Sequence, residues 1–354
     1  MNSSSQSCVQ TSLFSTKELA YEKRFSEWRD SIAALFDVSQ PNSRLSDNFN
    51  ATVKSSLLSQ DVMLARCDTV EQRWQRSVLR FAEDGLDHYL IQVQLDGKQC
   101  VSRGQKESWC SAGNLMIIDL AEKHDAYNIG KFSNFSVIVS RHMLSPLLLN
   151  PDSQEGRVLS AKQPLVNLAV EHMKSLEKTA HNFSPQEAES IIKPTLSLLA
   201  CALNGSADQV ENGRAIAGKS ILARCKNVIE QYLRKSDLSV DFLCRKIGIS
   251  RTNLYLMFKP YGGIQSYIVE RRLRRCAEDL LHHDNIKVPI YTISESWGFT
   301  STAHFSRIFK KRFGSSPGDI RQAKSVAQLH PEFILNQEVG DRHYERWLSE
   351  TLKS

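Results

Sequence analysis

The sequence predicts an α+β protein, with a β-rich N-terminal domain followed by an all-α C-terminal domain. Apolar and polar residues alternate with a period of two between Phe49 and Val139, which is typical of β-strands. Between Ile221 and Arg321 apolar residues recur at helical spacing, and one helix-turn-helix pattern occurs twice. A chain of 354 residues is long enough for two such domains. The expected boundaries are 1–205 for the N-terminal domain, 206–218 for a linker, 219–324 for the C-terminal domain and 325–354 for a C-terminal tail.

The N-terminal domain begins with a polar, serine-rich stretch over residues 1–16, which predicts a flexible arm. An amphipathic helix is predicted next because large apolar residues recur at helical spacing. These residues are Phe25, Trp28, Ile32, Leu35 and Phe36.

Strands are predicted where the period changes to two. Tyr89, Ile91, Val93 and Leu95 alternate with Leu90, Gln92 and Gln94. The pair Asp96-Gly97 predicts a hairpin turn after them. Two further strands are predicted over 115–119 and 135–139. Several short strands joined by turns indicate a small β-barrel or β-sandwich.

After Pro151 the pattern becomes helical. The stretch Pro164–Thr179 carries one apolar stripe, made of Leu165, Leu168, Ala169, His172, Met173 and Leu176. Ser184 and Glu187 form a capping box that begins a second helix, which runs to Leu203. Two interpretations of this helical pair stay open. It either packs on the strands or forms a homodimer interface.

Each helix-turn-helix copy of the C-terminal domain is defined by a glycine and a hydroxyl residue between two amphipathic helices. Gly248 can take the left-handed conformation that ends a helix, and Ser250 can cap the next one. Gly298 and Ser301 have the same roles in the second copy, and Ser301 lies 51 residues after Ser250. Between the copies, Tyr267–Leu281 contains no Gly or Pro, which predicts one long joining helix. A rigid joint that holds the two second helices about one DNA turn apart (~34 Å) would let both enter successive major grooves.

This region resembles the DNA-binding domain of the AraC/XylS family of transcription regulators. The resemblance covers about 100 residues, and it is specific because many motif residues keep fixed spacings. The matching residues are Leu243, Gly248–Ser250, Leu254, Phe258–Lys259, Tyr267–Ile268, Arg272–Leu273, Ile293, Gly298–Phe299, Phe305–Arg307, Phe309–Lys310, Phe313–Pro317 and Arg321. The sequence departs from the family at Cys244 and Ser294, where the family usually has Ala, and at Leu256, where Arg is common.

The resemblance implies double-stranded DNA as the partner, with the outward face of each second helix approaching the base edges. The implied DNA-binding residues are Ser250, Arg251, Thr252, Tyr255, Leu256, Lys259, Arg271, Arg274, Ser301, Thr302, Ala303, Ser306, Arg307, Lys310 and Lys311.

The charge distribution supports the same partner. Residues 219–324 hold 20 Lys and Arg against 9 Asp and Glu, a net charge of +11, whereas the rest of the chain carries −5. A charged stretch alone is more often a solvated face, but together with the repeat it favours a polyanion binder.

The N-terminal half resembles the cupin-like regulatory domain of one branch of the same family. The resemblance depends on Phe25, Trp28–Arg29, Asp87–Tyr89, Gln92, Gln94, Gly97, Ala112–Asn114 and Asp119. It implies a cupin-like β-barrel that binds a small-molecule effector. The candidate effector contacts are His88, Tyr89, Trp109, His124 and Tyr127. A single His or aromatic residue on a strand is more often structural, so the ordinary core interpretation stays open for all five.

The eight cysteines and ten histidines show no metal-binding pattern. No Cys-x-x-Cys or His-x-His occurs, so no metal or cofactor is expected. The first residues carry no secretory signal, and no run of 18 apolar residues predicts a membrane span, which indicates a cytoplasmic protein with reduced thiols.

The expected function is transcription regulation by a DNA-binding protein that is not an enzyme. The resemblance implies activation together with RNA polymerase, under control of a small-molecule effector. One alternative is a ligand-independent regulator. Another is an enzyme fused to a DNA-binding domain, such as an alkyl-transfer repair protein. That enzyme would need a reactive cysteine with a zinc-type Cys cluster or a Pro-Cys-His-like setting, and the sequence has neither.

Overall fold

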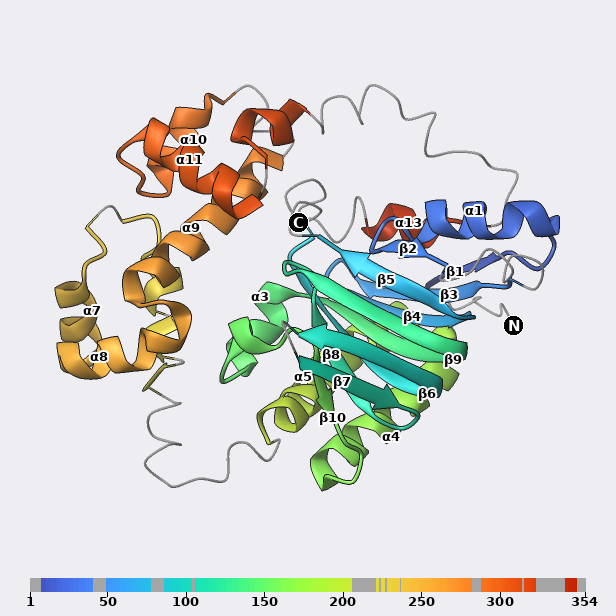
Figure 1. Ribbon diagram of the computed structural model, residues 1–354. Helices are drawn as coiled ribbons and strands as arrows, with labels where there is room; N and C mark the ends of the chain where they lie inside the picture. The colour runs from blue at the N-terminus through green and yellow to red at the C-terminus, as the bar shows by residue number, and fades with distance from the viewer. Residues whose placement is uncertain are drawn as a thin grey trace, which may run out of the picture. The chain divides into compact units, whose positions relative to one another are not determined.

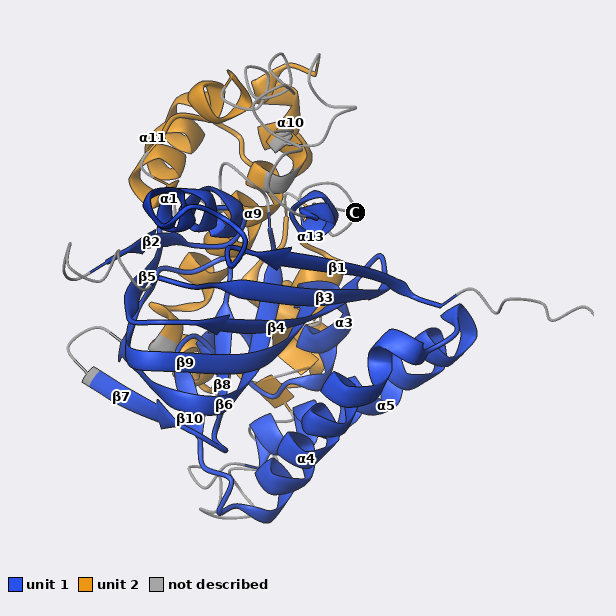
Figure 2. Cartoon of the chain, turned by 90° about the vertical axis from the view of Figure 1, so that its right-hand side faces the viewer, with its two compact units in different colours: residues 1–77, 86–207, 335–354 blue, residues 78–85, 208–334 orange. Residues whose placement is uncertain are grey.

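The computed structural model describes residues 8–40, 49–77, 86–103, 106–205, 221–222, 224–226, 228–235, 237–281, 288–313, 315–322 and 341–348. The chain divides into two compact units (Figure 2). One contains residues 1–77, 86–207 and 335–354, here called the β-domain; the other contains 78–85 and 208–334, here called the helical domain. The predicted linker, 206–218, and most of the predicted tail lie outside the described residues.

The β-domain is built on one curved antiparallel sheet of ten strands (Figure 1). Its strands are β1 (Gln10–Ser15), β2 (Asp37–Ser39), β3 (Thr52–Ser59), β4 (Val62–Thr69), β5 (Gln72–Arg76), β6 (His88–Arg103), β7 (Lys106–Ser111), β8 (Leu115–Asp119), β9 (His124–Ser140) and β10 (Arg157–Leu159). Strands β6 and β9 pair along most of their length and form its centre. β9 also pairs with β4 and β5, and β6 with β7 and β8. The predicted cupin-like β-domain is confirmed, as is the α+β class.

Two local predictions in this domain are wrong. Residues 10–15 of the predicted flexible arm form β1, because they pair in register with β3. Asp96-Gly97 is not a hairpin turn, since β6 continues to Arg103 and only shifts register there. Gly97 has φ +78°, and a Cβ at this position would lie 2.2 Å from the carbonyl oxygen of Lys131. The glycine is therefore required by a bulge at which two strands approach closely.

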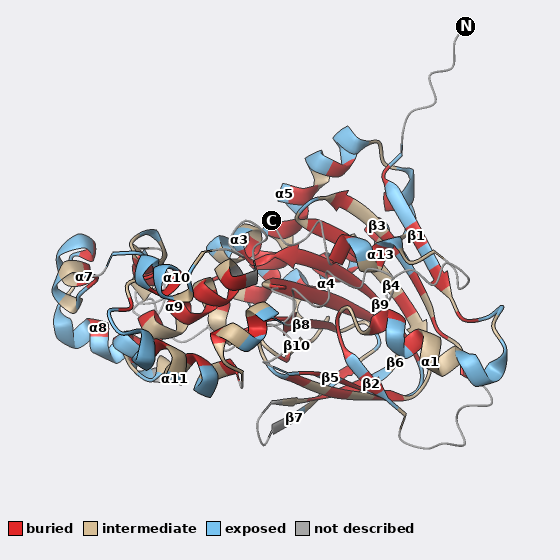
Figure 3. Cartoon of the chain, turned by 90° about the horizontal axis from the view of Figure 1, so that it is seen from above, coloured by how far each residue is buried: buried red, intermediate tan, exposed pale blue. Residues whose placement is uncertain are grey.

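The sheet has an apolar core on each face (Figure 3). Tyr89, Ile91 and Val93 of β6 pack in a cluster that includes helices α4 (Pro164–Thr179) and α5 (Pro185–Asn204). Leu90 of the opposite face belongs to a second cluster inside the curve of the sheet, together with residues of α1 (Tyr21–Ile32). The remaining short helices of this domain are α3 (Arg141–Leu144), η2 (Ser145–Leu147), η3 (Pro151–Ser153), η4 (Ala180–Asn182) and α13 (His343–Arg346).

The helical pair forms as predicted, with a different buried face. Ser184 accepts a hydrogen bond from the Glu187 amide at 3.3 Å, and the Glu187 carboxylate accepts one from the Ser184 amide at 2.8 Å. This is the predicted capping box. On α4, however, Leu165 and Leu168 are 42% and 57% exposed. The buried stripe consists of Val166, Ala169, Val170, Met173 and Leu176.

The helical domain contains both predicted helix-turn-helix copies. Its helices include α7 (Val240–Ile247), α8 (Arg251–Phe258), η6 (Lys259–Tyr261), α9 (Ile264–Leu281), α10 (Ile290–Ser296) and α11 (Thr302–Phe313). The joining helix α9 begins three residues before the predicted start at Tyr267. None of the described helices could cross a membrane. The described residues contain no group of three acidic, His or Cys side chains that could hold a metal ion.

The short helix α13 belongs to the β-domain although the helical domain precedes it in the chain. Figure 1 shows it beside α1, and the Tyr344 hydroxyl lies 2.5 Å from that of Ser31 on α1. Tyr344, Trp347 and Leu348 are buried in the inner core with Trp28 of α1. Residues 341–348, here called the C-terminal segment, therefore complete the interior of the β-domain.

Candidate nucleic-acid interface and barrel cavity

The two helix-turn-helix copies are capped as their sequences predict. Gly248 and Gly298 both have φ +80° and end the first helix of each copy. Ser250 accepts a hydrogen bond from the Asn253 amide at 3.3 Å, and Ser301 accepts one from His304 at 3.3 Å. Both second helices thus start with a satisfied amide, which fixes the direction of their outward faces.

The outward face of α8 is formed by the predicted residues. Leu254 and Phe258 are fully buried, whereas Tyr255 is 51% and Leu256 62% exposed. Thr252, Tyr255, Leu256 and Lys259 line a shallow surface hollow with Gly262 and Gly263. Arg251 is exposed and pairs with Asp241 at 2.5 Å.

The outward face of α11 is more basic. Phe305 and Phe309 are buried and fix the helix on the domain. The predicted contacts Thr302, Ala303, Arg307, Lys310 and Lys311 are exposed, and Ser306 is half-buried.

Arg271 and Arg274 of α9 are held by carboxylates of their own domain. Arg271 donates to Glu230 at 2.5 Å, and Arg274 donates to Glu270 at 3.0 Å. Burial acts to raise the pKa of Glu270, but Arg274 and Arg312 outweigh it and keep that pKa below its ordinary value. The Glu270 carboxylate is therefore charged at neutral pH. That Arg271 and Arg274 contact DNA phosphates stays a prediction.

Arg272, on the same helix, joins the two copies. Its guanidinium donates to the backbone carbonyls of Leu233 at 3.1 Å, Lys235 at 2.6 Å and Gly298 at 3.1 Å. It therefore connects the turn of the second copy to the chain before the first one. The sequence signal for this residue was its place in the family pattern, but its role as a joint could not be read from spacing.

A cavity of about 50 Å³ lies inside the curved sheet of the β-domain. Side chains of β6 and β9 form a polar strip on its wall. Gln92 donates to Gln99 at 2.7 Å and accepts from Asn134 at 3.4 Å, and Ser136 donates to Asn134 at 3.4 Å. The sequence analysis did not place these polar residues in a cavity, because alternation does not show what covers a face of the sheet.

Of the five predicted effector contacts, His124 lines this cavity. It is 1% exposed, and its Nδ1 lies 2.7 Å from the Glu155 carboxylate. The His124 Nε2 has no hydrogen-bond partner among the described residues. A buried nitrogen of this kind is the atom that a polar ligand group would meet.

The other four candidates lie elsewhere in the β-domain. Trp109 is 43% exposed and contacts Tyr127 edge to face, with ring centroids 5.7 Å apart. The imidazole of His88 is buried, and its Nε2 lies 3.0 Å from the Ser140 hydroxyl. None of these three lines the cavity.

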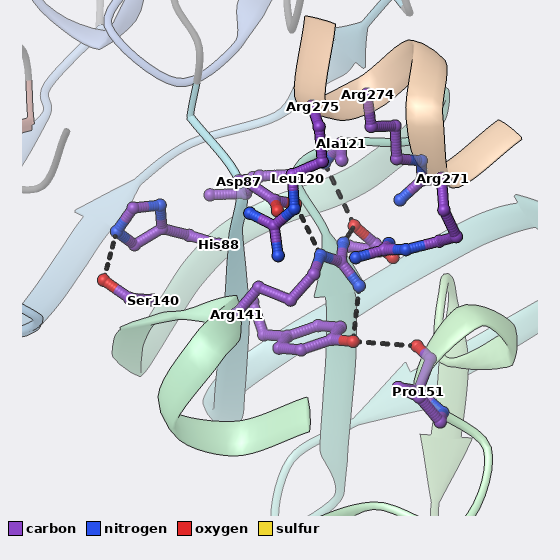
Figure 4. A network of polar contacts seen from close by, with 12 residues as sticks. Asp87, His88, Leu120, Ala121, Ser140, Arg141, Pro151, Arg271, Arg274 and Arg275 are labelled. Carbon is purple, nitrogen blue, oxygen red and sulfur yellow. Dashed lines mark hydrogen bonds and ion pairs between the residues drawn. The ribbon is translucent and has the colours of Figure 1, made fainter. Parts of the chain in front are cut away.

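Tyr89, the fourth, belongs to a buried ionic network (Figure 4). The Arg141 guanidinium donates to the carboxylates of Asp87 and Asp119 and to the Tyr89 hydroxyl. The Tyr89 hydroxyl donates to the carbonyl of Pro151 at 2.9 Å. These hydrogen bonds hold the Tyr89 side chain on the face of the sheet opposite to the cavity.

Comparison with known proteins agrees with two DNA-binding copies on one domain. A family model described as a helix-turn-helix domain matches residues 243–323. The probable transcription factor PqrA of Proteus vulgaris is 32% identical over 102 residues, which cover 28% of this chain and 81% of PqrA. The transcriptional activator NphR of a Rhodococcus species is 24% identical over 250 residues, covering 70% of this chain and 73% of NphR.

A solved structure extends the likeness to both domains. The AraC-like transcriptional activator CuxR superposes with a TM-score of 0.52 at 22% identity, covering 74% of this chain and 94% of CuxR. Fold and site together define a DNA-binding transcription regulator. The chain belongs to the AraC/XylS family of helix-turn-helix regulators. This is not a family of enzymes, so the enzyme alternative is set aside.

Proposed function

We propose that this regulator is an activator that reads DNA with α8 and α11 and responds to a small-molecule effector bound in the β-domain. The proposal that α8 and α11 read DNA depends on one observation, the exposed face of each capped second helix. Tyr255 and Leu256 on α8 and Arg307 on α11 are presented to solvent by helices whose other faces are buried. Activation is supported by the relative NphR, which is named a transcriptional activator. RNA polymerase, in the cytoplasm, is the partner that we propose for it.

Selection of binding sites from random duplex DNA by the full chain tests this part. We expect two enriched elements about one helical turn apart, roughly 10 to 10.5 base pairs from centre to centre, because each copy reads one major groove. A selection that enriches no sequence above the starting pool would contradict sequence-specific reading. A single enriched element would restrict base reading to one copy.

Effector control is supported by the cavity, whose wall carries the polar strip of Gln92 and Asn134 and the unpartnered Nε2 of His124. A ligand-independent regulator is the second candidate, and one observation favours it. The cavity of about 50 Å³ holds a few water molecules, whereas ligand pockets measure roughly 300–1,000 Å³. Operator occupancy measured with and without candidate metabolites separates the two functions.

A homodimer is supported by α4, because Leu165 and Leu168 are exposed there. The two leucines lie three residues apart on α4, so their side chains share one side of the helix. We expect Leu168→Asp to shift the full chain from dimer to monomer in sedimentation velocity, with its stability unchanged because the side chain is solvent-exposed. Thr179→Asp, on the same helix at an exposed position, is the control. A wild-type chain that sediments as a monomer at every concentration would contradict the dimer.

A further inference from the structure

The C-terminal segment is bonded to two elements of the β-domain. On β1, the Ser12 hydroxyl donates to the carbonyl of Asp341 at 3.3 Å and accepts from the Tyr344 amide at 3.4 Å. On α1, Glu27 accepts from Arg342 at 2.7 Å. These are mainly side-chain contacts, whereas the strands around the cavity are held by continuous backbone ladders. The segment can therefore leave the cavity wall without breaking a backbone ladder of the sheet.

Tyr344 places a phenol in that wall. Its side chain is 1% exposed and lines the cavity. Its hydroxyl lies 2.5 Å from the hydroxyl of Ser31, which is itself fully buried. Ser31 donates its own hydrogen to Glu345, so the Tyr344 hydroxyl donates to Ser31. Burial raises the pKa of Tyr344 well above its ordinary value, so the phenol stays neutral.

The rest of the cavity wall suits a neutral aromatic group with a hydroxyl. None of the described side chains that line it is Asp, Glu, Lys or Arg. Apolar residues such as Met63 and Ile138 surround the polar strip, and burial raises the pKa of Cys67, which keeps its thiol neutral. The His124 Nε2 is available to a hydroxyl group. A charged ligand would lose its hydration here without meeting an opposite charge.

With the segment docked, about 50 Å³ cannot admit an organic molecule. Removal of the Tyr344 ring opens a space of the shape and polarity that a phenol already fills. We propose that the barrel cavity binds a neutral phenol-like molecule in place of the Tyr344 ring, so that this molecule and the C-terminal segment occupy the barrel alternately. The proposal rests on the effector control proposed above, and it names the chemistry of the effector and the element that the effector displaces.

Displacement changes how the helical domain is attached. The chain leaves the β-domain after α5, forms the helical domain and returns to the β-domain at the C-terminal segment. With the segment docked, the helical domain is joined to the β-domain at both of its ends. When the ligand takes the place of Tyr344, one of these two connections is released, and the helical domain becomes free to sample more positions on DNA.

The test uses the full chain and 4-methylphenol, which is the tyrosine side chain as a free molecule. Hydrogen exchange of residues 341–348 is followed together with that of β4 and β9 as internal references. We expect 4-methylphenol at millimolar concentration to speed exchange of the segment while the two strands keep their protection. Toluene lacks the hydroxyl and should act more weakly by roughly 2- to 10-fold, the usual worth of one hydrogen bond. Benzoate, which is charged, should have no effect.

Variants at Tyr344 sharpen the test. Tyr344→Ala leaves a hole of the matching shape, so 4-methylphenol should raise its thermal midpoint more than that of the wild type. Tyr344→Phe keeps the ring but loses the hydrogen bond to Ser31, and it should need roughly 2- to 10-fold less ligand for displacement. Tyr291→Ala removes an exposed tyrosine of the helical domain and is the control, with no change expected in either readout.

Three results would overturn the inference. The first is a segment that exchanges freely in the wild type without ligand. The second is 4-methylphenol that binds the wild type and leaves the segment protected. The third is 4-methylphenol that binds neither the wild type nor Tyr344→Ala. Operator binding measured on the same samples keeps these outcomes apart from the proposed function: loss of DNA binding by the wild type contradicts that function, whereas DNA binding with a segment that never moves contradicts only the inference.

Discussion

Glu345 is the residue at which pH should act on the C-terminal segment. Burial raises the pKa of Glu345 from 4.5 to about 7, although Ser31 and Arg342 oppose the shift. Asp30 and Glu27 of α1 add to the rise. In the docked segment the Glu345 carboxyl therefore keeps its proton up to a higher pH than in the undocked segment. The contribution of Glu345 to docking is therefore complete below pH 4.5, falls as pH rises to about 7, and is constant above that.

We predict that the exchange protection of residues 341–348 falls between pH 5 and pH 7. The fall should be on the order of tenfold or more, since each unit of pKa difference is a factor of ten. Glu345→Gln keeps an acceptor for Ser31 and does not titrate, so its protection should stay flat across this range. His343→Ala is the control variant, because His343 lies in the same segment and pairs with Asp341. Equal pH slopes in the wild type and Glu345→Gln would exclude this carboxyl as the cause.

Arg307 and Lys311 should differ in what they contribute to DNA binding. Arg307 lies in the middle of the exposed face of α11, where an arginine can bond guanine O6 and N7, each good pair giving about 1–3 kcal/mol of discrimination. Lys311 lies near the end of the helix, where a phosphate contact is expected. We predict that Arg307→Ala relaxes specificity at one guanine and that Lys311→Ala weakens all sites alike. Site selection with both variants decides this, and an unchanged motif for Arg307→Ala rules out direct reading.

At this scale the helical period predicted the outward residues of α8, but it did not predict the buried face of α4. The exposure of Tyr255 and Leu256 follows from the helical period, which depends only on local spacing. Gln92 alternates with apolar neighbours as a solvent-facing residue would, yet it is 3% exposed. The reason is that both faces of the sheet are covered, one by α4 and α5 and the other by α1 and the C-terminal segment. Alternation shows which residues share a face of a strand, but it does not show what covers that face.

Among the elements, the two helix-turn-helix turns offer a matched pair of glycines. Gly248 and Gly298 share φ +80°, where a side chain costs about 1–2 kcal/mol. A Cβ at Gly248 would meet no described atom within 4 Å, whereas one at Gly298 would lie 2.7 Å from the guanidinium carbon of Arg272. The second copy should therefore tolerate the same substitution less well.

We predict that Gly298→Ala lowers the free energy of unfolding of the helical domain by about 1–3 kcal/mol more than Gly248→Ala. The extra loss comes from the hydrogen bonds that Arg272 makes to buried carbonyls, since it must move to make room. Urea denaturation of the full chain, followed by helical circular dichroism, measures both variants. Equal losses would show that Arg272 does not join the two copies. The sequence alone predicted both turns but not this joint, because the residues that meet at Arg272 come from distant parts of the chain.

For the whole molecule, the separation of charge predicts a strong dependence of DNA binding on salt. The residues 219–324 carry +11. Each phosphate contacted contributes about −0.9 to the slope of log K against log salt. If Lys310, Lys311 and Arg312 act with the exposed residues of α8, we expect a slope of roughly −4 to −6 for the full chain. A titration of operator binding between 50 and 200 mM salt measures it, and a flat slope contradicts the electrostatic part of the function.

The order of synthesis gives the position of the C-terminal segment a further consequence. About 140 residues separate the end of α5 from Tyr344. At about 5–20 residues per second, a ribosome needs roughly 7–28 seconds to make them. During this interval the strands of the β-domain are complete, but Tyr344, Trp347 and Leu348 do not yet cover the inner core. The proposed effector, if it binds during this interval, meets a barrel that Tyr344 does not yet fill, so binding at this stage displaces nothing.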